Sequence, residues 1–317
     1  MPPREPTLRL PHWKLPIYVV FLAGGVLLLA LSLTRGSLAS GPRQAFFGLA
    51  TTLLIVSLVE LVPELAAWVN ERSRRESFRR CFGNASFGRP VKLVFIFRES
   101  SRETPRPTKD MRGPGERRDY GVYSWLAFQD VRAGINVANT ISQITGHEVA
   151  VVQDKDVEEQ SQWDSTMISL GLGENHFTEA LGQDPEPSLF GIEWITTEKG
   201  KRKASFVLTP PCPDHPDENK DLALVARIVP RARERQRGCV WFVCGGRLAA
   251  GTSAAGHFLA ERWPEILDLY AKNGRDLDKH SLALVIEHKR DIRRHEFDHS
   301  AAIFELDGKP VLRWSPS

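Results

Sequence analysis

The chain has 317 residues, which is enough for one membrane anchor and one sizeable domain, or for two modest domains. Its formal net charge is only +3, and the basic excess gathers around apolar segments and one loop, which favours anionic lipid over nucleic acid as a partner. The four cysteines include no CxxC pair, so they argue against a disulfide framework and a zinc ribbon and indicate reduced thiols.

Two apolar segments near the N-terminus predict membrane-spanning helices. Residues 15–34 contain no charged side chain, and as a helix they reach about 30 Å, the thickness of a hydrocarbon core. Residues 44–59 are also uncharged, and residues 61–69 continue them with a single glutamate. Residues 35–43 are rich in Gly, Ser and Pro, which suits a tight turn. We therefore expect a two-helix transmembrane hairpin within residues 1–80.

Basic residues flank this hairpin on its outer sides and are fewer in the turn. By the positive-inside rule, both termini are expected in the cytoplasm. A soluble helical hairpin is the alternative, but the first segment has no polar face. The flanking cations are Arg4, Arg9, Lys14, Arg72, Arg74, Arg75, Arg79 and Arg80, whereas the turn holds only Arg35 and Arg43.

From residue 91 onward, short β-branched or aromatic runs alternate with helical patterns. This alternation predicts a cytoplasmic α/β domain over residues 91–317, with a Rossmann-like, mostly parallel sheet wrapped on both faces and a β-rich insertion. The expected strands are 91–97, 148–152, 166–170, 189–196, 204–209, 222–229, 239–243, 282–286, 301–306 and 311–314. The expected helices are 120–144, with an apolar face of Trp125, Phe128, Val131, Ile135 and Ala138, then 175–181 and 252–270.

Residues 99–119 lie between the first strand and the first helix of this domain. They are full of Arg, Glu, Pro and Gly and contain almost no apolar side chains. Such a composition predicts a mobile loop or lid.

Two glycine-rich segments that follow expected strands are the candidate ligand site. In open α/β sheets, ligands bind beyond the carboxyl ends of strands, where glycine admits the backbone and helix N-termini offer free N–H groups. Thr252 and Ser253 can cap the following helix, and Arg247 supplies a positive charge for an anion. Neither segment is a Walker loop or a GxGxxG motif, so tight structural turns are the alternative. The candidate ligand-binding residues are Gly171, Gly173, Glu174, Asn175, Gly245, Gly246, Arg247, Gly251, Thr252 and Ser253.

Catalytic and metal-binding signals are weaker. Glu174 and His176 are candidates for acid–base work, and Cys244 and Ser253 stand near a helix start with His257 following, but no pattern links a base to a nucleophile. His295, Glu296 and His299 form a literal HExxH, which binds zinc when it lies on a helix. Charged residues surround it and a strand hairpin follows, so we expect no metal there.

The segments FVCGGRLAAGTSAAGHFL and SLGLGENHFT resemble uncharacterised bacterial proteins with a Rossmann-like domain. The layout also resembles two-transmembrane effectors of nucleotide-signalled bacterial defence. The resemblance implies a nucleotide-type ligand and an output at a bacterial inner membrane. The residues themselves assign no cofactor beyond such a nucleotide ligand.

We therefore expect a membrane-anchored sensor for a nucleotide-like or other phosphorylated small molecule, with possible homo-oligomers and no nucleic acid as a partner. A nucleotide-directed hydrolase or N-glycosidase, and a passive membrane scaffold, are the alternatives.

Overall fold

A computed structural model describes residues 14–34, 40–95, 98–99, 124–125, 128–159, 163–172, 178, 181, 189–196, 202–208, 220–230, 238–246, 249–289, 297–306 and 309–315. The chain divides into two compact units, essentially Pro3–Glu76 and Ser77–Ser317. The second unit thus begins inside the range 1–80 that the sequence suggested for the anchor.

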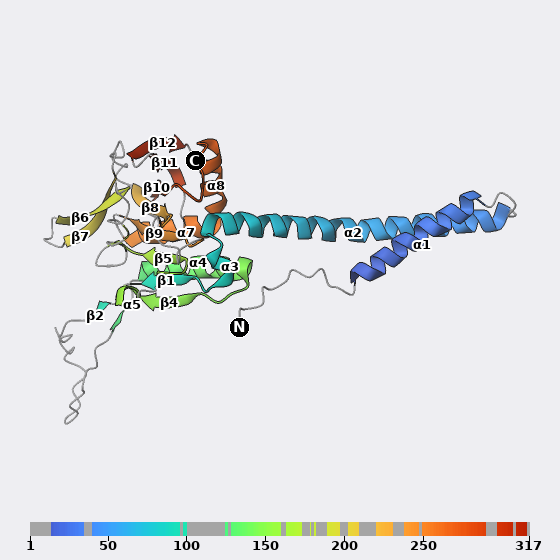
Figure 1. Ribbon diagram of the computed structural model, residues 1–317, viewed down its shortest axis with the longest axis horizontal. Coiled ribbons are helices and arrows are strands. Elements are labelled where there is room, and N and C mark those ends of the chain that lie inside the picture. The colour runs from blue at the N-terminus through green and yellow to red at the C-terminus, as the bar shows by residue number, and fades with distance from the viewer. Residues whose placement is uncertain are drawn as a thin grey trace, which may run out of the picture. The chain divides into compact units, whose positions relative to one another are not determined.

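The first unit holds α1 (Lys14–Thr34) and most of α2 (Ser40–Phe82), as Figure 1 shows. The two helices touch where a side chain on Gly25 would come within 2.9 Å of Leu54 Cγ, so glycine permits their close approach. Large apolar side chains on both helices are exposed, and Val20 and Val59 are more than 60 % exposed. Such surface suits lipid better than water.

Two helices are confirmed, but their capacity to span a membrane differs. Among the described residues, one helix, Phe47–Phe82, is long and apolar enough to cross a bilayer, and only 6 % of its apolar window is buried. The apolar part of α1, Val20–Leu31, is shorter than that. The structure therefore supports one candidate span rather than a clear transmembrane hairpin.

The second unit is built on an eight-stranded sheet with the order β12-β11-β10-β8-β9-β5-β1-β4. The run β4, β1, β5 and β9 is parallel, whereas β8, β10, β11 and β12 pair antiparallel. The sheet is therefore mixed, and the prediction of a mostly parallel sheet is confirmed only for its parallel core of β4, β1, β5 and β9. The strands are β1 (Lys92–Phe95), β4 (Ala150–Gln153), β5 (Met167–Leu170), β8 (Lys220–Ile228), β9 (Trp241–Gly246), β10 (Leu282–Lys289), β11 (Phe297–Leu306) and β12 (Lys309–Ser315), and all eight overlap predicted strands.

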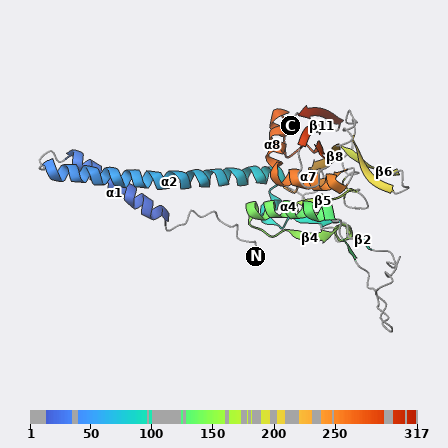
Figure 2. The same cartoon turned by 180° about the vertical axis from the view of Figure 1, so that it is seen from behind.

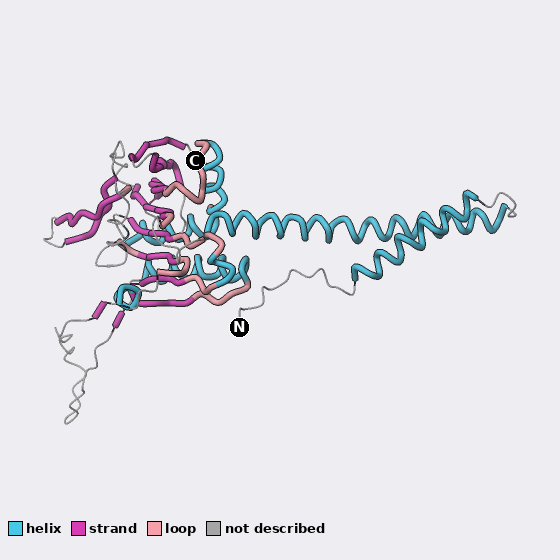
Figure 3. Tube along the Cα trace, in the orientation of Figure 1, coloured by secondary structure: helices cyan, strands magenta, loops and turns pink. Residues whose placement is uncertain are grey.

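Different elements cover the two faces of this sheet (Figures 2 and 3). One face packs against α4 (Phe128–Thr145), α7 (Ala249–Glu261), α8 (Trp263–Lys272) and the end of α2. The other packs against the hairpin β6 (Phe190–Thr196) and β7 (Arg202–Leu208), which is the predicted β-rich insertion, and against α5 (Asp154–Glu159). The described residues of this unit also form three short elements: α3 (Ala85–Gly88), β2 (Arg98–Glu99) and β3 (Ser124–Trp125).

The predicted helix 120–144 differs from α4 in its start and in its buried face. Trp125 lies on β3, and Phe128 and Ile135 are 72 % and 56 % exposed. The buried stripe instead consists of small and aliphatic residues, among them Ala133 and Val137. Small residues face inward because α4 lies very close to the sheet and to α7.

The predicted helix 252–270 is two helices. α7 ends at Glu261, and α8 begins at Trp263 with Pro264 in its first turn. Proline has no backbone N–H to continue the preceding helix but fits the first turn of a new one. The break therefore falls where Pro264 requires it.

Candidate functional site

The parallel strands reverse their order at the pair β1 and β5. From β1 the chain crosses to β4 on one side and then returns to β5 on the other side. Ligands of open α/β sheets bind in the crevice beyond the carboxyl ends of such a pair. The carboxyl edge beside Phe95 and Leu170, which we call the switch edge, is therefore the candidate site.

Helices α4 and α7 both approach the switch edge near their N-termini. A side chain on Gly134 of α4 would lie 2.4 Å from Phe95 Cζ and 3.2 Å from Leu170 Cδ1, which places this turn of α4 over the strand ends. A side chain on Gly256 of α7 would lie only 2.5 Å from Ala133 Cβ of α4, so the two helices are in close contact, and Figures 1 and 2 show them side by side. Two helix N-termini thus offer N–H groups and positive partial charge at one end of the sheet.

The first glycine segment starts at this edge, but one of its amides is already used. Gly171 has a φ of +94°, and its N–H donates to Cys244 O at 2.9 Å. The Thr178 hydroxyl donates to Gly171 O at 3.2 Å and lies 2.6 Å from the Ser169 hydroxyl. Gly171 therefore shapes a tight turn, and an anion would have to break an existing hydrogen bond to use its N–H. Gly173, Glu174, Asn175 and His176 lie outside the described residues.

The second glycine segment lies beside the first, as expected. β5 and β9 pair in parallel with Leu170 opposite Cys244, and a side chain on Gly245 would lie 2.3 Å from Leu172 Cγ. Gly246 and Gly251 face each other, since a side chain on Gly246 would come within 2.3 Å of Gly251 Cα. These glycines are required for the close passage of α7 over β9.

Thr252 and Ser253 do not cap α7. The helix begins at Ala249, so both residues lie inside it, and they are 4 % and 0 % exposed. The predicted capping role is wrong because the helix starts before Gly251, where the sequence pattern gave no apolar periodicity. Arg247 lies outside the described residues.

Cys244 is unsuited to act as a nucleophile. It is fully buried on β9, and burial raises the pKa of its thiol. The thiolate is the reactive form, and each unit of upward pKa shift lowers its fraction about tenfold at neutral pH.

We expect Cys244 in the native protein to react with iodoacetamide at pH 8 at least about tenfold more slowly than in the unfolded protein, as measured by mass spectrometry of the Cys244 peptide. The pKa of the Cys244 thiol is higher in the folded than in the unfolded protein. The contribution of the protonated thiol to folding stability is therefore fully present below the unfolded pKa of about 8.5, and it is lost as the pH rises through the folded pKa. Equal alkylation rates in the two states would contradict this assignment.

The HExxH segment does not form a zinc-binding helix where it is described. His299 lies on strand β11, opposite Glu287 of β10, and Phe297 already belongs to that strand. Because His299 lies on a strand, it cannot be one of two zinc-binding histidines on a single helix. In the described part of the chain, no group of three or more His, Cys, Asp or Glu residues is placed to hold a metal ion. His295 and Glu296 lie outside the described residues.

The structure adds two features that the sequence did not suggest. Asp221 and His288 are direct partners on β8 and β10, beyond the carboxyl end of β9, and are 3 % and 0 % exposed. Asp221 Oδ1 accepts the Leu222 N–H at 2.9 Å, and His288 Nδ1 lies 2.8 Å from Lys289 O. The second feature is Phe128, the exposed first residue of α4. Asp221 and His288 are 67 positions apart, so no local sequence pattern indicates that they lie side by side. Phe128 was expected on the buried apolar face of its helix.

Comparison with known proteins gives no family assignment: the chain matches no family model, no curated protein and no solved structure.

Proposed function

We propose that the chain is a membrane-anchored sensor whose α/β domain binds a nucleotide-like or other phosphorylated small molecule at the switch edge. The observation that carries the proposal is the convergence of α4, α7 and both glycine segments at the ends of β1, β5 and β9. Helix N-termini favour phosphate groups, because they present unsatisfied N–H groups and a positive partial charge.

The anchor in this proposal is the pair α1 and α2, inserted as a hairpin in a bacterial inner membrane with both termini in the cytoplasm. The exposed apolar side chains of both helices and the flanking arginines support it. The resemblance to two-transmembrane defence effectors gives the expected output, which is a change at the membrane. Self-association of such effectors in the plane of the bilayer is part of the proposal.

An enzyme is the second candidate, because the buried residues Asp221 and His288 lie opposite each other on β8 and β10, beyond the carboxyl end of β9. Such a pair can perform general acid–base work if substrate reaches it. The activity would be that of a nucleotide-directed hydrolase or N-glycosidase; the sequence candidates Glu174 and His176 lie outside the described residues.

One experiment separates these functions. The detergent-solubilised full chain is incubated with a panel of mono-, di- and cyclic nucleotides and with inorganic phosphate, and both the thermal shift and the products are measured. A ligand present at about 100 times its Kd stabilises the folded state by about 2.7 kcal/mol, which is readily measured. A shift without product supports the sensor, and product formation supports the enzyme. The absence of both a thermal shift and a product would favour a passive scaffold.

Phe128 provides a sharper test of where a nucleotide binds. It is 72 % exposed at the N-terminus of α4, so its ring is free to stack on a base, and base–aromatic stacking is worth about 1–3 kcal/mol. We expect Phe128→Ala to raise the Kd of a bound nucleotide about tenfold, as measured by thermal-shift titration. Ile135→Ala is the matched control, since Ile135 is exposed on the same helix two turns from Phe128. An equal rise in Kd in both variants would indicate that the base does not stack on Phe128.

A further inference from the structure

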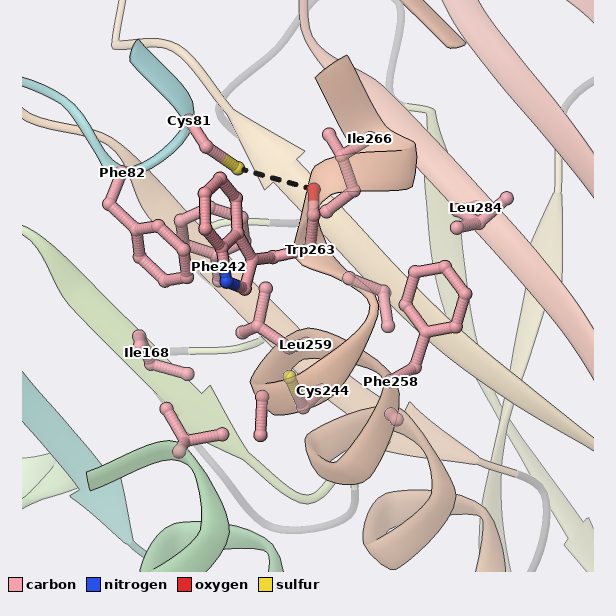
Figure 4. Close-up of a cluster of buried hydrophobic side chains, with 14 of the residues drawn as sticks. Cys81, Phe82, Ile168, Phe242, Cys244, Phe258, Leu259, Trp263, Ile266 and Leu284 are labelled. Atoms are coloured by element: carbon pink, nitrogen blue, oxygen red, sulfur yellow. Dashed lines mark hydrogen bonds between the residues drawn. The ribbon is translucent and has the colours of Figure 1, made fainter. Parts of the chain in front are cut away.

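The C-terminal end of α2 is part of the core of the α/β unit. Phe78 and Phe82 are 0 % and 1 % exposed, and their rings stack at 4.1 Å. Phe78 meets the Trp263 ring edge-on at 5.4 Å, and Phe82 lies 4.9 Å from the Phe242 ring of β9. Figure 4 shows Phe82, Phe242 and Trp263 together, with the Cys81 thiol directed at Trp263 O. The last turn of α2 is therefore fixed to the sheet by side chains from β9 and α8.

Arg227 of β8 binds the carbonyl groups at the end of α2. Its Nε donates to Cys81 O at 2.8 Å, and its Nη2 donates to Arg80 O at 3.3 Å. Its Nη1 donates to Leu277 O at 2.7 Å and to the Tyr270 hydroxyl at 3.3 Å. The side chain is 1 % exposed. Its partners are thus neutral oxygens, and two of them lie at the negative end of the α2 dipole.

A buried cation held in this way is an expensive choice for stability alone. Removing a guanidinium from water is costly, and no carboxylate among the described residues accepts a hydrogen bond from Arg227 to offset that cost. An apolar side chain of similar volume would avoid desolvating a charge but would leave the carbonyl oxygens that Arg227 binds without this donor. What Arg227 adds is direction, because its planar fork fixes the angle and register of the α2 carbonyls against β8.

The two strands that hold α2 also reach the switch edge. Arg227 and Phe242 are direct partners on β8 and β9, and four residues further along the same pair Ala223 lies opposite Gly246. Four residues of strand span about 13 Å. At that end, Leu222 O lies 2.9 Å from the side-chain position of Gly251 on α7. A continuous pair of strands therefore runs from the end of α2 to the start of α7.

We propose that Arg227 is a positioning residue that couples the switch edge to α2, so that displacement of α7 and β9 by a bound ligand changes how the last turn of α2 is held. The inference rests on the proposed sensor function and names the part of the fold that transmits the signal. Coupling between two sites is reciprocal, so disturbing α2 at Arg227 must also alter the switch edge in the absence of ligand. This reciprocity allows a test that needs no knowledge of the ligand.

The test is hydrogen exchange of the full chain in detergent, followed by mass spectrometry, for the wild type, Arg227→Met and Arg227→Lys. Methionine keeps the volume and removes the charge, whereas lysine keeps the charge and loses the fork geometry. We expect Arg227→Met to speed exchange about tenfold or more in peptides covering 77–82 and also 249–256, because hydrogen bonds to charged groups are the strong ones. Arg227→Lys is expected to give a smaller rise in the same two regions and keeps the test informative if the methionine variant does not fold.

Lys279→Met is the matched control, since Lys279 is a surface cation near Leu277 with an exposed ion pair to Asp276. It is expected to change neither region. Faster exchange confined to 77–82 would overturn the coupling, because the switch edge would then be indifferent to α2. An equal rise throughout the sheet, including β4 and β12, would also overturn it, because Arg227 would then be a residue of general stability. Absence of nucleotide binding in the thermal-shift assay is a separate result and would count against the sensor function alone.

Discussion

Replacement of Gly251 by valine is expected to destabilise the α/β unit severely. Even the first side-chain atom would lie 2.6 Å from Gly246 Cα and 2.9 Å from Leu222 O, and neither backbone atom can move without displacing β8 or β9. A side chain improves helix propensity over glycine by at most about 1 kcal/mol, and by less for β-branched valine, whereas overpacking a core costs about 1–3 kcal/mol and more where backbone must shift. The cost of overpacking therefore exceeds the gain in helix propensity. A net loss of about 3 kcal/mol lowers Tm by roughly 6–12 °C in a unit of this size.

Thermal unfolding followed by tryptophan fluorescence measures this effect, because Trp241 and Trp263 are buried in the same unit. Gly191→Ala is the matched control: Gly191 lies on β6 with open space where a side chain would go, so its Tm should change little. If Gly251→Val instead kept its Tm and lost only its response to nucleotides, Gly251 would be a ligand contact, as the sequence first suggested, rather than a packing position.

The positions of the strands were predictable, but the directions in which they pair were not. Residues 222–229 are apolar except for Arg227 and predict a buried strand, and β8 (Lys220–Ile228) covers all but the last of them. The same run suits a parallel and an antiparallel neighbour equally well, because burial on both faces removes the alternation of apolar and polar residues. β8 lies antiparallel to β9, and this choice depends on the path of the whole chain rather than on local residues.

The candidate site was predicted as a location but not as a set of contacts. The two glycine segments do lie on neighbouring strands, because glycine after a buried run is a strong local signal for a turn at the sheet edge. Which glycines pack a helix and which face a ligand depends on atoms far away in the sequence, such as Leu222 O beside Gly251. Arg227 is the clearest case: a charged residue within a strand would be expected at the surface, yet the α2 carbonyls that it binds lie 146 and 147 positions away.

Truncation of Phe82 to alanine is expected to destabilise the α/β unit about as much as a substitution in the middle of the sheet. Phe82 is 1 % exposed between Phe78 and Phe242, although the sequence places it in a basic segment after an apolar helix. Removing a buried phenylalanine side chain costs about 3–5 kcal/mol, because apolar contacts are lost and a cavity remains. At roughly 2–4 °C per kcal/mol, Tm should fall by roughly 6–20 °C in the full chain.

Phe128→Ala makes the same chemical change at a site that is 72 % exposed and is expected to alter stability by no more than about 0.5 kcal/mol. The contrast between the two phenylalanines decides whether α2 ends outside the α/β unit or within it. A small effect at Phe82 would mean that the aromatic cluster forms without the helix, and the coupling through Arg227 would then lose its mechanical basis. A large effect would mean that α2 cannot leave the core without unfolding the unit, so that any signal between the two must pass as a shift of a docked helix rather than as its release.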